Sequence, residues 1–416
     1  MGIVIVGAGP AGVTVAETLR KLGYDGEITM LSKEPFPPYS PPLMADYLET
    51  SGKSKLIFWK GSDFAEKHDI RLKTGVEVVG VSPSSKRIYL SDGGEIGYDR
   101  LVIASGSKMW IPLECRCGEP KGRVQYYNFK SLSAVSHLLE EVQKGASKAV
   151  VIGAGFIGME IAITLRKIGL EVLVVEMQDR ILPRMVSRET SRYLERIVRD
   201  LGIELLLNSR GVMLKGEEVA EELLLEDGRT IKGDLFIAAT GVKPNVEFLA
   251  DSGIEVGRGI SVNEYLETSV PDIYACGDVA DVRDLVTGNA YPHAIYPEAI
   301  QQGKTVALNI MGYRKPYDGG VNMNSLYHFH LPLISEGAMV GEVEPDETFF
   351  YEDGSVMRKI DIKDGKILRF ELVGDKKGAG FLHTLLVKRE EIERIKDRIL
   401  RGKYNHAHLM LETIPH

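Results

Sequence analysis

Residues 2–22 read GIVIVGAGPAGVTVAETLRKL, and residues 148–168 read KAVVIGAGFIGMEIAITLRKI. Each stretch begins as an apolar strand, continues through a glycine-rich turn and ends in a helix that finishes with Thr-Leu-Arg-Lys. The first glycines of the two turns, Gly7 and Gly153, are 153 − 7 = 146 positions apart. A solenoid repeat would be far shorter. The repeat therefore predicts two separate βαβ nucleotide-binding modules.

The glycine turn of the first copy has the pattern of a dinucleotide-binding loop. It consists of Gly7, Ala8, Gly9, Pro10, Ala11 and Gly12. In such a loop the first glycine permits a tight turn, the second lets the backbone approach a pyrophosphate, and the third lets the helix pack on the strand. The N-terminus of the helix then faces the phosphates. Because the turn follows a strand and opens a helix, this function is favoured over an ordinary βα turn.

The second copy has the same context, and an acidic residue follows it. Its turn consists of Gly153, Ala154, Gly155, Phe156, Ile157 and Gly158. Glu176 closes the next strand, 176 − 153 = 23 positions after the first glycine. An acidic residue at about this distance can accept hydrogen bonds from a ribose 2′-hydroxyl and would repel a 2′-phosphate. NADH is therefore favoured over NADPH, although Arg180 and Arg184 weaken that preference. The alternative is that Glu176 is a solvated strand end.

The rest of the chain extends this α/β pattern. Near-continuous apolar strands joined by helices predict parallel sheets covered on both faces. The Pro-rich residues 34–42 should be irregular, and strands are expected at 76–81 and 87–90. A polar stretch at about 107–123 is predicted to cross between domains. From about residue 316 hairpin-like runs and a charged helix at roughly 388–402 indicate a C-terminal α+β domain.

Composition excludes several classes of function. The net charge of −8 and the pI near 5.7 argue against a nucleic-acid partner, which would require a basic face. The sequence has no uncharged apolar run of 18 residues, so no membrane span is expected. The missing basic leader favours a cytoplasmic location. Three cysteines fit neither a zinc site nor a disulfide framework, and no metal is expected.

The arrangement of two motifs resembles the FAD-dependent pyridine nucleotide-disulfide oxidoreductase family. Rubredoxin and ferredoxin reductases, NADH oxidases and coenzyme A disulfide reductases are members. Residues 268–278, TSVPDIYACGD, resemble the family's second FAD segment. The resemblance implies an FAD domain made of 1–110 and 243–315, an NAD(P)H domain at 111–242, and a C-terminal domain at 316–416. In relatives this last domain often forms a dimer contact, so a homodimer is the expected oligomer.

The resemblance also implies which residues bind the cofactors. Asp278 would hydrogen-bond the ribityl chain of FAD. Glu34 is the expected partner of the adenosine ribose, with Ser32 as an alternative and Lys33 beside them. Residues 104–106 and 239–241 resemble the paired turns at which the chain of family members crosses between the two domains. The remaining implied cofactor contacts are Val78, Ala104, Ser105, Gly106, Gly241, Gly277, Pro297 and Glu298.

Hydride transfer requires few titratable groups. A nicotinamide passes hydride to a flavin when the two rings stack at about 3–3.5 Å, and the protein mainly positions them. The helix predicted at 297–303 would direct its N-terminus at the negative charge of the reduced flavin, unless it is an ordinary surface helix. Glu160 resembles a glutamate beside the flavin and is the catalytic candidate. A plain helix residue there would face the sheet, where an unpaired carboxylate is costly.

The cysteines bear on the electron acceptor. Disulfide-reducing members with one redox cysteine keep it in a segment that resembles 39–42, and Pro42 stands about at its position. Cys115 and Cys117 are expected in an exposed inter-domain loop without a redox role, and Cys276 should be buried. Coenzyme A disulfide reduction is therefore disfavoured, and rubredoxin, ferredoxin or oxygen is the expected acceptor. The alternatives are a redox sensor that binds FAD and NADH without turnover, and a subunit of a larger dehydrogenase.

Overall fold

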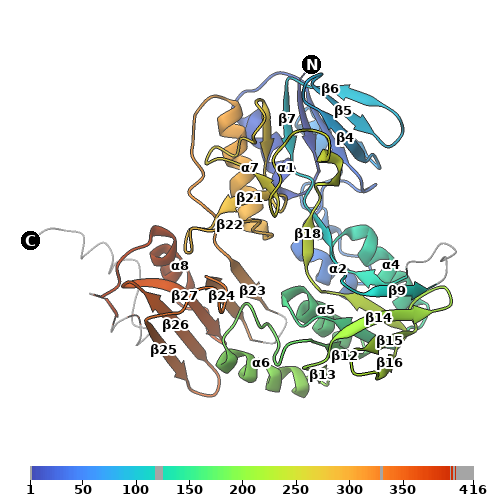
Figure 1. Ribbon diagram of the computed structural model, residues 1–416, viewed down its shortest axis with the longest axis vertical. Coiled ribbons are helices and arrows are strands. Elements are labelled where there is room, and N and C mark those ends of the chain that lie inside the picture. The colour runs from blue at the N-terminus through green and yellow to red at the C-terminus, as the bar shows by residue number, and fades with distance from the viewer. Residues whose placement is uncertain (1, 118–124, 328–330, 394, 397–398, 400–416) are drawn as a thin grey trace, which may run out of the picture.

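Three five-stranded sheets organise the molecule (Figure 1). The computed structural model describes residues 2–117, 125–327, 331–393, 395–396 and 399. Two of the sheets are parallel, with the strand orders β20-β7-β1-β2-β3 and β10-β17-β11-β12-β13. The third is antiparallel, with the order β23-β24-β27-β26-β25. The two parallel sheets confirm the predicted α/β class.

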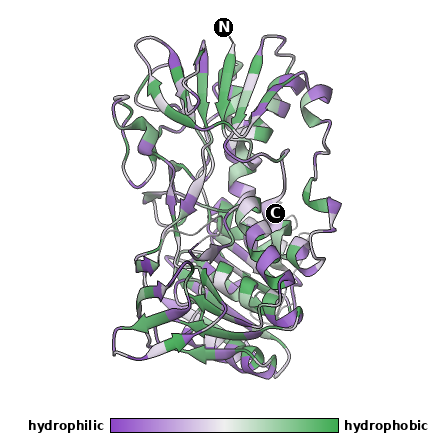
Figure 2. Ribbon diagram, turned by 90° about the vertical axis from the view of Figure 1, so that its right-hand side faces the viewer, coloured by the Kyte–Doolittle hydropathy of each residue, from purple (hydrophilic) through white to green (hydrophobic). Residues whose placement is uncertain are grey.

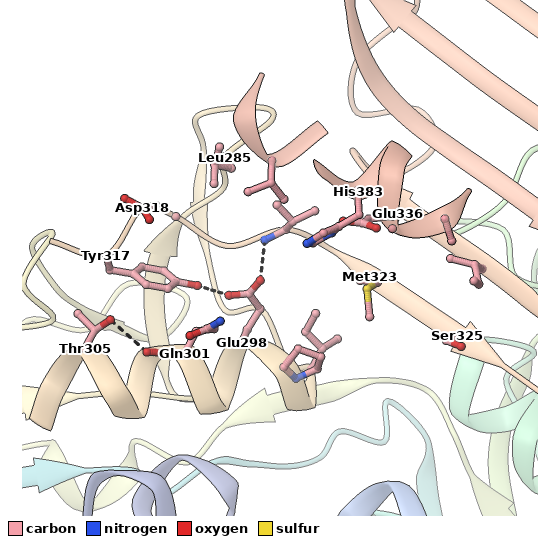
Figure 3. Close-up of a pocket in the computed structure, with 18 of the residues that line it drawn as sticks. Leu285, Glu298, Gln301, Thr305, Tyr317, Asp318, Met323, Ser325, Glu336 and His383 are labelled. Atoms are coloured by element: carbon pink, nitrogen blue, oxygen red, sulfur yellow. Dashed lines mark hydrogen bonds and ion pairs between the residues drawn. The ribbon is translucent and has the colours of Figure 1, made fainter. Parts of the chain in front are cut away.

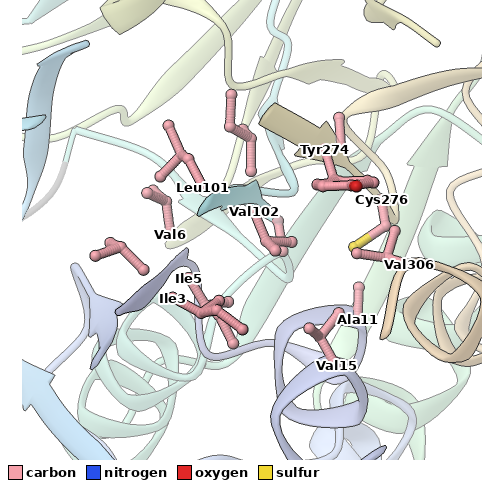
Figure 4. Close-up of a cluster of buried hydrophobic side chains, with 14 of the residues drawn as sticks. Ile3, Ile5, Val6, Ala11, Val15, Leu101, Val102, Tyr274, Cys276 and Val306 are labelled. Carbon is pink, nitrogen blue, oxygen red and sulfur yellow. The ribbon is translucent and has the colours of Figure 1, made fainter. Parts of the chain in front are cut away.

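The first parallel sheet combines segments that are far apart in the sequence. Four of its strands lie between residues 3 and 103, and β20 joins them from residues 273–275. Its strand β1 is buried along its whole length, which explains its continuous apolar sequence. Figure 4 shows Ile3, Ile5 and Val6 of this strand in one cluster with side chains of α1, β7 and α7. The elements of this region are β1 (Ile3–Val6), α1 (Pro10–Lys21), β2 (Ile28–Ser32), β3 (Arg71–Thr74), β4 (Val78–Ser82), β5 (Arg87–Leu90), β6 (Glu95–Gly97), β7 (Arg100–Ile103), β19 (Ile260–Ser261), β20 (Ile273–Ala275), β21 (Ala280–Arg283), β22 (Ala290–Tyr291) and α7 (Tyr296–Ile310).

The second parallel sheet repeats this βαβ arrangement, and a four-stranded sheet of the order β16-β15-β14-β9 lies beside it. Figure 2 shows that strands throughout the molecule are largely hydrophobic, whereas the connecting segments carry many hydrophilic residues. The elements of this region are β9 (Glu114–Cys117), β10 (Tyr127–Asn128), α4 (Leu132–Gln143), β11 (Lys148–Ile152), α5 (Phe156–Lys167), β12 (Glu171–Val175), α6 (Arg188–Asp200), β13 (Glu204–Leu206), β14 (Gly211–Gly216), β15 (Glu222–Leu225), β16 (Thr230–Lys232) and β17 (Leu235–Ala238).

The cysteine pair lies on a strand, so the expectation of an exposed loop was wrong. Cys115 and Cys117 belong to β9, which pairs in parallel with β14, and both are partly buried. Alternate residues of a strand share a face, and the two Sγ atoms are 3.2 Å apart. Burial, and then the neighbouring thiol, raises the pKa of Cys117 to about 12. Residues 118–123 of the predicted crossing lie outside the described part.

A short helix after the Pro-rich segment packs on the second module, which the sequence did not predict. The Pro-rich residues 34–42 are irregular up to a short 3-10 turn at Pro41–Leu43, and α2 (Met44–Glu49) follows. Met44, Ala45 and Leu48 are buried in a cluster together with side chains of α4 and α5. Two further short helical segments follow at η2 (Lys55–Ile57) and α3 (Phe64–Lys67). The chain between β2 and β3 therefore ties the two modules together.

The C-terminal region contains an antiparallel sheet on which helix α8 packs. Its elements are β23 (Met323–Leu326), β24 (Leu333–Gly337), β25 (Glu347–Glu352), β26 (Met357–Lys363), β27 (Lys366–Val373) and α8 (Ala379–Lys388). Helix α8 ends at Lys388 and so lies before the predicted helix at 388–402. Within that range residues 389–393 are not helical, Lys396 and Ile399 are helical, and most of 394–402 lies outside the described part, so this helix stays a prediction. The three sheets fall inside the three predicted domains, whose boundaries stay a prediction. No helix among the described residues is long and apolar enough to cross a bilayer.

A buried carboxylate joins the C-terminal sheet to the second module. Glu371 of β27 is 1% exposed and accepts hydrogen bonds from the backbone N–H of Ser187 at 2.8 Å and from its Oγ at 2.9 Å. The Thr190 hydroxyl donates to the same carboxylate. Ser187 is the N-cap of α6, where a negative charge interacts favourably with the helix dipole. Burial nevertheless raises the pKa of Glu371.

Replacing Glu371 should weaken the attachment of the C-terminal region. We expect Glu371→Ala to lower the free energy of unfolding by about 1–3 kcal/mol, because buried donors lose their acceptor. Denaturant unfolding followed by circular dichroism measures this change. Glu344→Ala, at an exposed carboxylate of the same region, is the control and should have little effect. Equal stability of the two variants would show that the Glu371 contacts contribute nothing.

Candidate functional site

Two chain crossings between the modules are hydrogen-bonded to each other. Strands β8 (Ser107–Met109) and β18 (Val242–Pro244) run antiparallel. At one end of this pair, where Ser105 precedes β8 and Asn245 follows β18, Ser105 Oγ donates to the carbonyl of Asn245 at 2.9 Å, and Asn245 Nδ2 donates to the carbonyl of Ser105 at 2.8 Å. Gly241 accepts a bond from the Trp110 N–H at 3.0 Å. The predicted crossing turns 104–106 and 239–241 therefore lie at opposite ends of the paired strands, and this pairing fixes how the two modules face each other.

The outer glycines of the first loop are required by the protein's own backbone. A Cβ added at Gly7 would lie 2.1 Å from the carbonyl oxygen of Ala104, and Gly7 has a φ of +112°. A Cβ at Gly12 would lie 2.1 Å from the carbonyl oxygen of Gly7. The second loop repeats these clashes, at 2.5 Å for Gly153 and 2.0 Å for Gly158. These four glycines make the tight turn and bring each helix close to its strand.

The middle glycine of each loop faces open space. A Cβ at Gly9 or at Gly155 would meet no atom within 4 Å, and their φ angles of −76° and −71° suit any residue. No side chain caps α1 or α5, so their first N–H groups point into that space. The fold does not need glycine at these two positions, whereas a close-approaching pyrophosphate does. Both loops therefore fit a dinucleotide.

Asp278 lies at the seam between the modules. Its Oδ2 accepts hydrogen bonds from Ser107 Oγ at 2.7 Å and from Lys130 Nζ at 2.8 Å. Ser107 belongs to the crossing strand β8, and Lys130 precedes α4 of the second module. The sequence did not single out Lys130, because nothing local links it to a residue 148 positions away. The described bonds occupy one carboxylate oxygen, which fits the predicted contact of Asp278 with the ribityl chain.

The start of α7 converges with the first glycine loop. A Cβ at Gly303 would lie 2.6 Å from the carbonyl oxygen of Ala11, so glycine lets α7 pack closely on α1. Gln302 Oε1 accepts a bond from the Gly277 N–H at 2.7 Å, whereas its buried Nε2 has no partner among the described residues. Pro297 lies in the first turn of α7, as expected of proline. The first turn of α7 also lies near Gly277, because a Cβ added at Gly277 would lie 3.9 Å from the Cβ of Ala299. The role of this helix N-terminus beside the flavin stays a prediction.

Glu298 points away from that junction. Its carboxylate accepts hydrogen bonds from the Tyr317 hydroxyl and from the Val321 N–H, the latter at 3.1 Å. It lines a cavity between α7 and the C-terminal region (Figure 3). Burial raises its pKa. A contact of Glu298 with the cofactor stays a prediction.

Two of the three residues expected at the adenosine ribose of FAD, Lys33 and Glu34, already have side-chain partners. Lys33 Nζ pairs with the partly buried Glu77 at 2.7 Å. Glu34 Oε1 accepts bonds from the Ser133 N–H at 2.9 Å and from Ser133 Oγ at 2.8 Å, and the Tyr39 hydroxyl donates to its other oxygen. Glu34 therefore links the loop after β2 to the start of α4. A bond from Glu34 to the ribose stays a prediction and would have to be added to these contacts.

The two glutamates of the second module differ in burial. Glu176 is 6% exposed, and its carboxylate accepts bonds from the N–H groups of Ala154 at 2.7 Å and Gln178 at 2.8 Å. It is not a solvated strand end. Glu160 lies in the second turn of α5 and is only partly buried. Without a function, Glu160 was expected to be buried against the sheet, and it is not. Its catalytic role stays a prediction, as does the contact of the cofactor with the buried Val78.

Residues 1–303 match the model of the pyridine nucleotide-disulphide oxidoreductase family. The chain belongs to this family. It is therefore an enzyme of the class that uses FAD and NAD(P)H, in agreement with two loops that each fit a dinucleotide. The predicted family and enzyme class are confirmed.

Several members of the oxidoreductase family resemble the whole chain. An NADH oxidase of Methanocaldococcus jannaschii is 31% identical over 91% of this chain and 89% of its own length. An assimilatory nitrate reductase electron transfer subunit of Bacillus subtilis is 29% identical over 96% of this chain, which spans 51% of that protein. The crystal structure of a ferredoxin reductase from Rhodopseudomonas palustris superposes with a TM-score of 0.84, at 29% identity, over 94% of this chain and 95% of that chain.

Substitution of the two kinds of glycine should have different effects. We expect Gly9→Ala to leave the stability of the FAD-free protein unchanged but to weaken FAD binding by about tenfold or more, which is about 1.4 kcal/mol. Gly12→Ala should destabilise the FAD-free protein itself, because its Cβ would overlap the Gly7 carbonyl. Thermal melting of the FAD-free proteins and titration with FAD measure the two effects. A loss of stability in Gly9→Ala that equals the loss in Gly12→Ala would contradict this division.

Proposed function

We propose that this oxidoreductase oxidises NADH and passes the electrons to an iron-containing carrier protein rather than to a disulfide. The position of the cysteines carries this proposal. Pro42, in the short turn before α2, stands about where disulfide-reducing members with a single redox cysteine keep it. Cys276 is fully buried, and burial raises its pKa to about 12. Cys115 and Cys117 belong to the second module, on β9.

Bound FAD accepts a hydride and can release its two electrons singly, and this chemistry belongs to the cofactor. The chain has to hold both dinucleotides so that their rings meet. Gly9 and Gly155 leave room for the phosphates at the starts of α1 and α5. The first turn of α7 lies near Gly277, and its free backbone N–H groups would stabilise negative charge on the flavin. The paired crossings keep the two modules in register.

The surroundings of Glu176 support NADH over NADPH. A 2′-phosphate at the end of β12 would meet this buried carboxylate. The two arginines that could offset the repulsion have other partners. Arg180 bonds Asp179 at 3.0 Å and the carbonyl of Pro183 at 2.9 Å, and Arg184 Nη2 lies 3.3 Å from the Met339 sulfur.

A role as a subunit of a larger enzyme is the second candidate. It is favoured by the resemblance to an electron transfer subunit that is about twice as long as this chain. In that case a further protein or domain would take the electrons in place of a free carrier. A homodimer through the C-terminal region and a cytoplasmic location stay predictions.

Steady-state turnover with different acceptors tests the proposal. The purified protein, loaded with FAD, is given NADH and either rubredoxin, a ferredoxin, oxygen or coenzyme A disulfide. We expect kcat/KM to be highest with one of the two iron proteins. Fastest turnover with coenzyme A disulfide would overturn the choice of acceptor. Rapid flavin reduction with very slow reoxidation by all four would favour a redox sensor or a missing partner subunit.

Removing the carboxylate of Glu176 should relax the coenzyme preference. We expect Glu176→Ser to lower the ratio of kcat/KM for NADH to that for NADPH by about tenfold, which is about 1.4 kcal/mol. Flavin reduction by each coenzyme under anaerobic conditions measures the ratio. Glu171→Ser, at the exposed start of the same strand, is the matched control. An unchanged ratio in Glu176→Ser would show that Glu176 does not discriminate between the ribose 2′-hydroxyl of NADH and the 2′-phosphate of NADPH.

A further inference from the structure

A cavity of about 620 Å³ separates α7 from the C-terminal region (Figure 3). Its volume lies within the range of roughly 300–1,000 Å³ that is typical of small-molecule sites. Glu298, Gln301 and Thr305 line it from one side of α7. The side of α7 that packs on α1 carries Gln302 and Gly303 instead. The cavity therefore lies across α7 from the first glycine loop.

Carboxylates from two different elements reach this cavity. Glu298 comes from α7, and Glu336 comes from β24, where it is 3% exposed. The connection between α7 and β23 contributes Asp318. Figure 3 shows Glu298 and Glu336 on different walls of the cavity. The raised pKa of Glu298 has burial as its main cause, so its surroundings compensate its negative charge incompletely.

Cationic side chains do not balance these acids. Among the described lining residues only Lys315 and His383 can carry a positive charge. His383 Nδ1 lies 2.5 Å from Glu336, and this bond raises the pKa of the histidine. Three acids therefore face two bases, so an anionic ligand would be repelled and a cation attracted.

The remaining walls are apolar and contain one buried hydroxyl without a partner. Ser325 Oγ makes no hydrogen bond to any described residue. Tyr327 also lines the cavity and is 58% exposed, which places it at the opening. A ligand for these walls needs an apolar body and a polar end. The apolar lining includes Leu285, Ile295, Val321, Met323, Ile334 and Val387.

We propose that this cavity, which borders the predicted flavin contacts Pro297 and Glu298, is a binding site for a small organic amine with an apolar or aromatic body. The ammonium group would lie against Glu298, where each carboxylate oxygen accepts one described bond and has a further lone pair. The body would fill the space between α7 and β23. The ligand would thus hold the C-terminal region against the helix whose N-terminus lies at the flavin site.

Three probes of the same shape and different charge test the choice of ligand. Phenethylamine, phenethyl alcohol and phenylacetate are titrated by calorimetry into the FAD-loaded protein without NADH. We expect one equivalent of the amine to bind and the other two to bind at least about tenfold more weakly, a difference of about 1.4 kcal/mol. Equal binding of the alcohol would overturn the role of charge. No binding of any probe at millimolar concentration would overturn the site.

Two variants locate the amine. Gly380 of α8 lines the cavity, and a Cβ there would meet no atom within 4 Å, so Gly380→Phe should fill the cavity and abolish amine binding. FAD content and the rate of flavin reduction by NADH should stay unchanged in this variant. Glu298→Gln should weaken amine binding by about tenfold or more, whereas Glu344→Gln, an exposed carboxylate outside the cavity, should not. Unchanged amine binding in Gly380→Phe would overturn the assignment to this cavity.

Discussion

The pairing of β8 with β18 is the constraint on which the rest of the structure depends. A chain that leaves one nucleotide-binding module and later returns to it could hold the second module in many orientations. Here the outgoing strand β8 and the returning strand β18 are hydrogen-bonded to each other. Ser105, which precedes β8, and Asn245, which follows β18, also bond to each other. Because each module opens at the carboxyl end of its parallel sheet, this pairing sets how the two openings face each other. Asp278 and Lys130 add a charged contact across the same seam.

The glycine loops separate what the fold needs from what the ligand needs. Gly7, Gly12 and their counterparts in the second module are required by carbonyl oxygens of the chain itself. Gly9 and Gly155 face open space, and their requirement becomes clear only when a phosphate is placed there. The same six-residue pattern therefore carries a structural signal and a functional signal at different positions. This division occurs twice in one chain, which strengthens it as evidence for two bound dinucleotides.

Helix α7 connects the predicted flavin site with the cavity beside the C-terminal region. One side packs on α1 through Gly303, and its first turn lies near Gly277 and Asp278. The other side presents Glu298 to a cavity whose far walls belong to β24 and α8. Buried acids recur along the C-terminal region, since Glu336 pairs with His383 and Glu371 caps α6. Burial of a carboxylate is costly unless donors surround it, so these contacts fix where the C-terminal sheet can sit.

The sequence by itself determined the two modules, their glycine loops and the family, because each of these depends on residues that are close along the chain. Strand, turn and helix follow one another within about 20 residues, and local periodicity is enough to recognise them. Only the tertiary structure decided which distant donors satisfy Glu34 and Asp278, that Glu176 is buried, and that α2 packs on the second module. It also placed Cys115 and Cys117 on a strand and Glu298 in a cavity. Such contacts join residues up to 186 positions apart, and a carboxylate has no local signature of the donor that it will meet.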